Sequence, residues 1–233
     1  MKNSKIFTVV LLLLLAVSML VTACSGGQAP ASSSEPASSA PAGIEPSGTE
    51  PAEAGKVERH TSDDNKVVTL NGELKAMETP VLLTSVGQSA DVSMLDALLK
   101  KIGAEYTFNT TAKADDMGGA KTIIIATGAS SKGLGAAGIS ADEEKARGKE
   151  LLQACKDNEV TVIMAHLGGT SRRGKLSDEF SDMVLEYASG IIMVEDGNDD
   201  GKFSDFAKEK NIPITLVNKI ADCIDPLKTM FGK

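Results

Sequence analysis

The stretch Val160–Gly174, with the sequence VTVIMAHLGGTSRRG, decides the class of fold that the chain is expected to adopt. Its first half is apolar and rich in β-branched residues without alternation, which is typical of a strand buried on both faces of a parallel sheet. Its second half holds paired glycines, two hydroxyl side chains and two adjacent arginines. In open α/β sheets, ligands bind beyond the carboxyl ends of the strands. The stretch therefore predicts a buried strand that ends at a cationic ligand site.

Apolar segments of the same kind recur along the chain and alternate with helical segments. The expected strands are Val81–Val86, Glu105–Phe108, Thr122–Thr127, Val160–Ala165, Ile191–Val194 and Ile214–Val217. The expected helices are Asp91–Ile102, Ser140–Asp157, Asp178–Tyr187, Lys202–Lys210 and Ala221–Phe231. This order indicates an α/β fold with a doubly wound, mostly parallel five- or six-stranded sheet, flavodoxin-like or Rossmann-like.

Two glycine-containing segments give further local predictions. Asn71-Gly72 favours the positive φ angles of a tight turn, so Val67–Leu70 and Glu73–Met77 are expected to form a hairpin. The glycine-rich segment after Thr127 is expected to be a long mobile loop that closes on a ligand.

The N-terminal residues have the order of a secretory leader. Met1–Lys5 is basic, and Ile6–Val21 is an apolar run that is short for a permanent membrane span. The run ends in Val21-Thr22-Ala23-Cys24, which resembles the lipobox of bacterial lipoproteins. The resemblance implies that residues 1–23 are a signal peptide and that Cys24 carries a lipid anchor with fatty acyl chains such as palmitate. It places the protein on the extracytoplasmic side of a bacterial cell membrane.

The segment after the cysteine has the composition of a linker. It is rich in Ser, Pro, Ala, Gly and Glu and has no aromatic residue up to residue 64. Such a segment cannot bury enough apolar surface to offset the loss of chain entropy. Residues 24–64 are therefore expected to be the anchor cysteine and a disordered tether, and residues 65–233 a single α/β domain.

The charge of the chain excludes one class of partner. The formal net charge is −8 and would become −10 once the leader with Lys2 and Lys5 is removed. Binding of nucleic acid depends on Lys and Arg that neutralise phosphates, so no nucleic acid partner is expected. The membrane is expected to be contacted through the lipid on Cys24.

The two cysteines of the folded region fall among apolar residues of expected helices. Cys155 and Cys223 are therefore interpreted as small core residues, although a disulfide between them stays open because sequence does not fix their distance.

Two motifs match known ligand sites only in part. Gly133–Gly138 has the glycine spacing of a dinucleotide fingerprint, but it starts five residues after its strand and precedes the next helix cap. Asp196–Gly201 copies the opening of a calcium loop, yet Ala207 stands where the twelfth-place Glu is required. No cofactor and no metal are therefore predicted. Asn198 or Asp200 is expected to cap the following helix, and residues 195 and 196 to face the crevice.

The predicted ligand site gathers small polar residues and cations at the ends of neighbouring strands. If the strands that end at Val86, Thr127 and Ala165 are neighbours, their exits share one crevice. Glycines there let backbone N–H groups approach a ligand, and Arg suits the recognition of carboxylate or phosphate. The residues expected to bind a small anionic ligand are Ser85, Gln88, Ser130, Ser131, Lys132, His166, Gly168, Gly169, Arg172 and Arg173.

Three of these exits also carry a resemblance. The segments ATGASSKGLGAAGI, AHLGGTSRRG and VEDGNDDGKF are similar to those of a functionally uncharacterised family of bacterial exported and lipoprotein α/β domains. The resemblance covers the chain from Thr79 to the C-terminus. It implies a secreted α/β domain and carries no catalytic residue, since the family has no assigned activity.

Three functions are compatible with these patterns. The first is a lipid-anchored extracytoplasmic module that binds a small anionic ligand for a membrane transporter or receptor, without catalysis. The second is a surface hydrolase with His166 as general base, for which Ser130 and Glu195 could complete a catalytic trio. The third is a structural or protein-interaction domain.

Overall fold

The computed structural model describes residues 57–233, which contain one seven-stranded sheet with the order β1-β7-β6-β5-β4-β2-β3. Neighbouring strands are parallel except β1, which is antiparallel to β7. The strands are β1 (Val67–Leu70), β2 (Val81–Val86), β3 (Thr107–Phe108), β4 (Thr122–Thr127), β5 (Thr161–His166), β6 (Gly190–Val194) and β7 (Ile214–Val217). The predicted α/β fold with a mostly parallel sheet is confirmed. The predicted leader, Cys24 and tether residues 25–56 lie outside the described residues.

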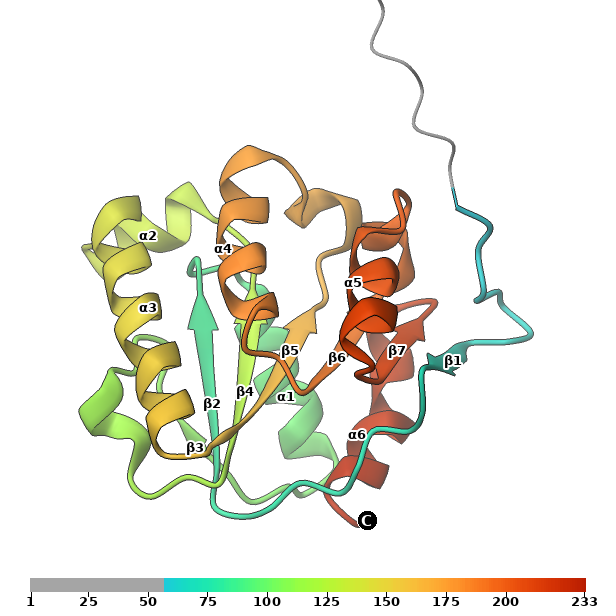
Figure 1. The fold of residues 1–233 in the computed structure, drawn as a ribbon, viewed down its shortest axis with the longest axis horizontal. Helices are drawn as coiled ribbons and strands as arrows, with labels where there is room; N and C mark the ends of the chain where they lie inside the picture. The colour runs from blue at the N-terminus through green and yellow to red at the C-terminus, as the bar shows by residue number, and fades with distance from the viewer. Residues whose placement is uncertain (1–56) are drawn as a thin grey trace, which may run out of the picture. The chain divides into compact units, whose positions relative to one another are not determined.

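Helices cover both faces of the sheet (Figure 1). The α-helices are α1 (Asp91–Lys101), α2 (Ser131–Ala137), α3 (Ala141–Asp157), α4 (Lys175–Leu185), α5 (Lys202–Lys210) and α6 (Ile224–Met230). The 3-10 helices are η1 (Ala114–Met117), η2 (Gly169–Arg172), η3 (Glu195–Asn198) and η4 (Ile220–Cys223). Helices α3, α4 and α5 pack on one face, and α1 and α6 pack on the other.

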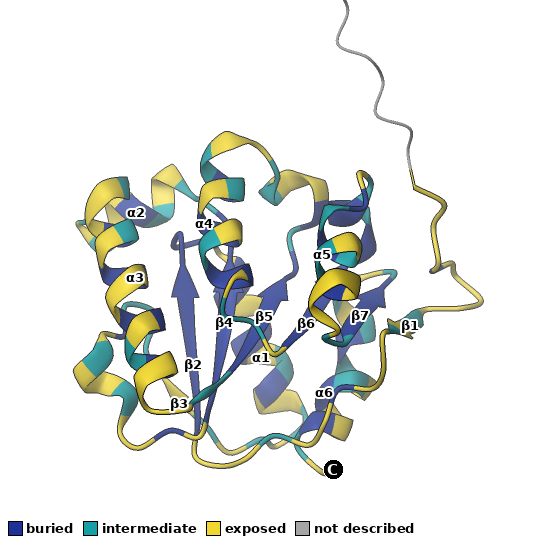
Figure 2. Cartoon of the chain, viewed as in Figure 1, coloured by how far each residue is buried: buried dark blue, intermediate teal, exposed yellow. Residues whose placement is uncertain are grey.

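The apolar character of the central strands follows from this double cover. In β4, Ile123 and Ile125 belong to the core under α3, α4 and α5, whereas Ile124 and Ala126 belong to the core under α1 and α6. Successive side chains of a strand point to opposite faces, so a sheet buried on both faces needs apolar residues at every position. Figure 2 shows the central strands buried along their length.

The prediction of a hairpin at the start of the domain is wrong. Val67–Leu70 is a strand, but it pairs antiparallel with β7 at the edge of the sheet, and residues 73–77 form no strand. Asn71 and Gly72 do adopt positive φ angles of 61° and 110°. The turn therefore leads the chain away from β1 instead of back along it, and β1 adds a strand to the five or six that were expected.

The prediction of a long mobile loop after β4 is also wrong, because most of this glycine-rich segment is helix α2. Ser130 caps this helix, since its Oγ accepts a hydrogen bond from the N–H of Gly133 at 3.0 Å. Glycine has a low helix propensity, but close packing requires it at one position of this helix. An ideal Cβ at Gly133 would lie 1.8 Å from the carbonyl oxygen of Gln88. Only glycine lets the helix approach the β2 exit this closely.

The two described cysteines are unpaired and lie on opposite faces of the sheet. Cys155 belongs to the core under α3, α4 and α5, and Cys223 to the core under α1 and α6. Burial raises the pKa of the Cys155 thiol to about 11 and that of Cys223 to about 12. Both are core residues, as the helical pattern predicted, and no disulfide joins them.

Candidate functional site

The sheet order places the carboxyl ends of β2, β4 and β5 side by side, as the predicted crevice requires. The connections after β2 and β4 are in direct backbone contact. An ideal Cβ at Gly87 would lie 2.4 Å from the carbonyl oxygen of Gly128, and Gln88 forms a β-bridge with Ala129. The space between these two exits is therefore filled by the backbone of the protein.

A buried ion pair on α3 holds the β2 exit in this position. The carboxylate of Glu144 accepts hydrogen bonds from the N–H of Gly87 at 2.9 Å and from Nε2 of Gln88 at 3.0 Å. Arg147 bonds the same carboxylate through Nε at 2.7 Å and Nη2 at 2.6 Å, and also donates to the carbonyl of Ser85. Sequence reasoning missed this pair, because α3 is highly charged and an i, i+3 spacing of opposite charges is usual on an exposed helix face.

Five predicted ligand-binding residues at these two exits serve other contacts or face solvent. Ser85 donates to a carbonyl of β4, Gln88 bonds the Glu144 carboxylate, and Ser130 caps α2. Ser131 and Lys132 are exposed on the first turn of α2. These five residues do not line the cavity at this edge of the sheet.

This cavity lies where β2, β5, β6 and β7 end, and its volume is about 580 Å³. Its wall is built from the start of α1 and from the segments that contain η2, η3 and η4. This size is within the usual range for small-molecule sites. The lining residues are Asp91, Met94, Leu167, Gly168, Gly169, Ser171, Arg172, Val194, Asp196, Asn218, Lys219, Ile220 and Ala221.

Arg172 is the predicted arginine that lines the cavity. Its Nε donates to Oδ1 of Asp91 at 3.3 Å, and its Nη1 donates to the carbonyl of Ser171 at 3.3 Å. Among the described residues, Nη2 has no hydrogen-bond partner. The aliphatic part of the side chain packs on Gly128 and Gly168, where an ideal Cβ would approach it to 2.9 Å and 2.1 Å. The guanidinium therefore keeps donors that could bind an anion.

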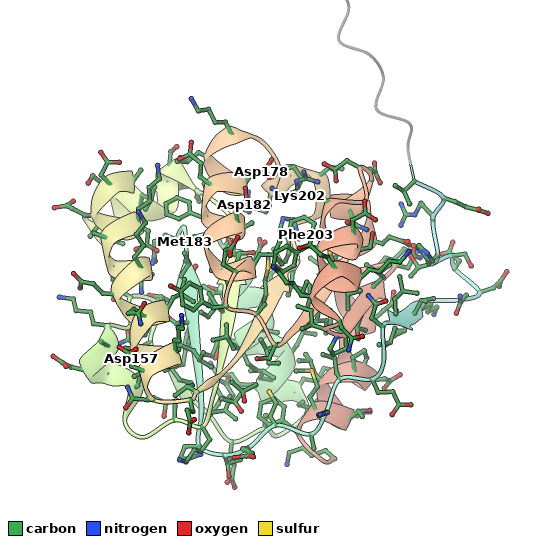
Figure 3. All side chains as sticks on the ribbon, viewed as in Figure 1. Asp157, Asp178, Asp182, Met183, Lys202 and Phe203 are labelled. Atoms are coloured by element: carbon green, nitrogen blue, oxygen red, sulfur yellow. The ribbon has the colours of Figure 1, made fainter. Side chains whose placement is uncertain are left out.

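Arg173 has a different place, although it is adjacent in sequence. Its Nε donates to Asp178 at 2.9 Å, and Nη1 and Nη2 donate to the two carboxylate oxygens of Asp200 at 3.0 and 2.7 Å. Nη1 also donates to the carbonyl of Gly197 at 2.6 Å. The bonds to Asp200 are the main reason why its pKa is raised. The guanidinium also lies over the ring of Phe203, which Figure 3 labels together with Asp178. Arg173 thus joins η2 to α4 and to the segment that contains η3.

His166 is fully buried at the end of β5. Its Nε2 lies 3.1 Å from the carbonyl oxygen of Arg172, which can only accept, so Nε2 carries the proton. Nδ1 has no partner among the described residues and lies against Gly197, where an ideal Cβ would be 3.0 Å away. Burial is the largest influence on the pKa of His166 and lowers it. The neutral ring therefore fixes the backbone at Arg172, in the arginine loop (residues 167–174) that follows β5.

Glu195 binds the segment that precedes β1. Its carboxylate accepts hydrogen bonds from the N–H groups of His60 at 2.6 Å and Thr61 at 2.7 Å, and from the Thr61 hydroxyl. Burial alone would raise the pKa of Glu195, but the hydrogen bonds from Thr61 and His60 together outweigh it and lower the pKa. Residues 60 and 61, which the sequence assigned to the tether, therefore pack on the domain.

Two carboxylates line the cavity together with Arg172. Asp196, which was expected to face the crevice, extends from η3, and Asp91 is the first residue of α1. No sequence pattern distinguished Asp91, since an acidic residue in the first turn of a helix is common. The wall after β7 was likewise not expected to take part.

The segment that resembled a calcium loop caps a helix. Oδ1 of Asn198 accepts a hydrogen bond from the N–H of Phe203 at 2.9 Å, which confirms the predicted cap of α5. Asp200 is paired with Arg173. Within residues 57–233, no group of three or more His, Cys, Asp or Glu side chains is placed to hold a metal ion.

Residues 78–231 match the model of a family described as a domain of unknown function, DUF6305. The chain belongs to this family. The match covers the β2 to α6 part of the sheet and all the walls of the cavity, so the cavity is built within the DUF6305 domain. The family description assigns no activity to any residue.

Comparisons with characterised proteins add little beyond the family. No curated protein matches the chain. A psychrotrophic esterase from Pseudoalteromonas is similar with a TM-score of 0.32 and 10% identity over 66% of this chain and 98% of the esterase. A GDSL-like lipase from Bacteroides thetaiotaomicron is similar with a TM-score of 0.27 and 12% identity, over 57% of this chain and 65% of the lipase. A GDP-L-fucose synthetase from Naegleria fowleri is similar with a TM-score of 0.27 and 12% identity, over 59% of this chain and 54% of the synthetase. These scores are too low to carry an argument about activity.

The described helices were also compared with the length of a membrane span. None of the helices in residues 57–233 is both long and apolar enough to cross a membrane.

Proposed function

We propose that this DUF6305 protein is a binding module for a small ligand that carries a carboxylate or phosphate group. In this proposal, the lipid on Cys24 and the tether hold the domain at the outer side of a bacterial cell membrane. The module keeps the ligand available for a membrane transporter or receptor and makes or breaks no bond in it.

The observation that carries the proposal is the position of Arg172 at the cavity. The cavity lies at the carboxyl ends of the strands, where open α/β sheets bind their ligands. Arg172 lines it with a guanidinium that has one long contact to Asp91 and an Nη2 without a partner among residues 57–233. A planar carboxylate or a phosphate can accept two parallel hydrogen bonds from such a group.

The contacts of the other two cations near the site make Arg172 the best candidate. Arg173 is held by Asp178 and Asp200, and Lys219 at the rim of the cavity bonds Asp63 at 2.7 Å. Arg172 is less exposed than Lys219, and its guanidinium can form two parallel hydrogen bonds to a carboxylate or phosphate, so an anion in the cavity would bind best at Arg172. Because the protein is acidic as a whole, this local positive group would select a small anion rather than a polyanion.

Calorimetric titration of the full-length chain in detergent micelles tests this proposal. The probes are 4-methylpentanoate, acetate and inorganic phosphate. At least one of them should bind, and Arg172→Gln should weaken its binding by at least about tenfold, since a charge-assisted pair contributes 1.5–3 kcal/mol in typical proteins.

The matched control is Lys101→Gln, which removes an exposed cation at the other end of α1. This variant should bind the same probe with unchanged affinity. Equal weakening by both substitutions would point to overall charge instead of a site at Arg172. Absence of binding by these probes and by every other small carboxylate or phosphate tested would favour a structural or protein-interaction domain.

The alternative of a hydrolase gains no support from the contacts of its proposed residues. The hydroxyl of Ser130 caps α2, His166 bonds a backbone carbonyl, and Glu195 bonds residues 60 and 61. Among the described residues, none of these three side chains hydrogen-bonds another of the three. We therefore propose binding without catalysis.

A further inference from the structure

The cavity presents two carboxylates whose charge is incompletely compensated. Asp91 is 1% exposed; its Oδ1 accepts from Arg172, and its Oδ2 has no hydrogen-bond partner among residues 57–233. Oδ1 of Asp196 is also buried and has no hydrogen-bond partner among the described residues. Both residues line the cavity.

The two carboxylates approach the same short piece of backbone. An ideal Cβ at Gly168 would lie 2.8 Å from Oδ2 of Asp91, and one at Gly169 would lie 1.9 Å from Oδ1 of Asp196. The Cα atoms of consecutive residues are about 3.8 Å apart. The paired glycines therefore leave room for two acidic groups on one strip of the cavity wall.

A buried carboxylate is costly unless a cation or several hydrogen-bond donors accompany it. Arg172 supplies one cation for the two carboxylates, through a single bond of 3.3 Å to Asp91. Lys219 contributes little to this strip, because its Nζ bonds Asp63 and its side chain is 68% exposed. Within residues 57–233, Oδ2 of Asp91 and Oδ1 of Asp196 therefore lack a donor, and a positively charged group of a ligand can provide one.

An organic ammonium group suits the site better than a metal ion. A divalent cation such as Ca²⁺ takes about six to eight oxygen ligands, and in residues 57–233 no three His, Cys, Asp or Glu side chains are placed to hold a metal ion. The guanidinium of Arg172 beside Asp91 would also repel a bare cation. A ligand with both an ammonium and a carboxylate would satisfy the two aspartates and the arginine together.

The rest of the wall indicates the remainder of the ligand. Side chains of Met94, Leu167, Val194 and Ile220 line the cavity, and an aliphatic group can pack on them. A wall that holds both charged groups and apolar side chains matches an amino acid with an aliphatic side chain.

We infer that the cavity binds an aliphatic amino-acid zwitterion, with its carboxylate at Arg172 and its ammonium group at Asp91 and Asp196. This inference rests on the proposed function, because it names the chemical class of the ligand that the same site receives. The net charge of such a ligand is zero, so discrimination would depend on two opposite charges at a fixed separation.

Three probes with the same branched chain test the inference on the unmodified protein. Leucine carries both charges, 4-methylpentanoate lacks the ammonium group, and 3-methylbutylamine lacks the carboxylate. Calorimetric titration of the full-length chain in detergent micelles should show that leucine binds at least about tenfold more tightly than either analogue, because each analogue leaves a charged group of the site unpaired.

Two substitutions assign each charge to its partner. Asp196→Asn should abolish the advantage of leucine over 4-methylpentanoate, and Arg172→Gln should abolish its advantage over 3-methylbutylamine. Asp205→Asn, which changes an exposed acid on α5 outside the cavity, is the matched control and should preserve both advantages.

The outcomes separate this inference from the proposed function. If 4-methylpentanoate binds through Arg172 as tightly as leucine, the inference is overturned and the anion site stands. If no carboxylate or phosphate binds, both fail. Tight binding of Ca²⁺ alone that is lost in Asp196→Asn would overturn the inference in favour of a metal site. The comparison of the three probes needs no variant, so it remains decisive even if Asp196→Asn does not fold.

Discussion

At the scale of single residues, neighbours in sequence have different roles at the arginine loop. The sequence identified Arg172 and Arg173 as equal candidates, and the structure separates them. Arg172 lines the cavity, whereas Arg173 bonds Asp178 and Asp200, which are 5 and 27 residues further along the chain. No sequence pattern could make this distinction, because it depends on contacts with α4 and with the segment after η3.

His166 gives the stability of the protein a dependence on pH. Burial lowers its pKa below the ordinary value of 6.5, so the folded state keeps the ring neutral where the unfolded chain takes up a proton. The free energy of unfolding should therefore be unaffected by this residue above pH 6.5 and should fall as the pH drops below it. The slope reaches at most about 1.4 kcal/mol per pH unit. Urea unfolding between about pH 5 and pH 7 measures it.

His166→Gln should flatten this slope, since glutamine does not titrate. His60→Gln is the control, because His60 is the other histidine of the chain. If the slope disappeared in the His60 variant and persisted in His166→Gln, the buried histidine would not be its source.

At the scale of elements, patterns of apolar residues predicted most of the fold. The central strands and the helices α1, α3, α4 and α5 lie close to their predicted positions. The errors concern β1 and α2, whose formation depends on partners. β1 exists because β7 offers an unpaired edge, and α2 forms because Gly133 allows contact with the β2 exit. Local propensity cannot report such contacts.

The Glu144 and Arg147 pair should be important for the element that it supports. Glu144→Gln would leave the buried Arg147 guanidinium without its carboxylate, and breaking a buried pair from one side typically costs 3–5 kcal/mol. We expect a loss of about 3 kcal/mol in the free energy of unfolding, measured by urea denaturation.

Glu143→Gln is the matched control for this variant. Glu143 is exposed, and its side chain accepts a hydrogen bond from the N–H of Ser140 in the capping box, which glutamine can also accept. The free energy of unfolding of Glu143→Gln should fall by less than about 1 kcal/mol. Similar losses in the two variants would mean that the buried pair has no special role.

At the scale of the whole molecule, the sequence alone predicts the location of the protein. In a bacterial host, Cys24→Ser should prevent lipid attachment and move the protein from the membrane fraction to the soluble fraction outside the cytoplasmic membrane. Fractionation with immunoblotting measures this change. Mass spectrometry of the N-terminus provides the second readout, and only the unsubstituted protein should begin with an acylated Cys24.

Cys223→Ser is the control for this experiment, since Cys223 is buried in the core under α1 and α6. This variant should keep its membrane association. A Cys24→Ser protein that stays with the membrane would instead support an uncleaved hydrophobic anchor in residues 6–21.

The hold of Glu195 on the segment before β1 also has a mechanical consequence. A force applied to the chain ahead of Val57 would first load the bond from the Val57 N–H to the carbonyl of Asp199, and then the bonds of Glu195 to residues 60 and 61. The ladder between β1 and β7 comes later along the chain. Pulling would therefore strain the end of β6, in the interior of the sheet, before it could peel the edge strand away.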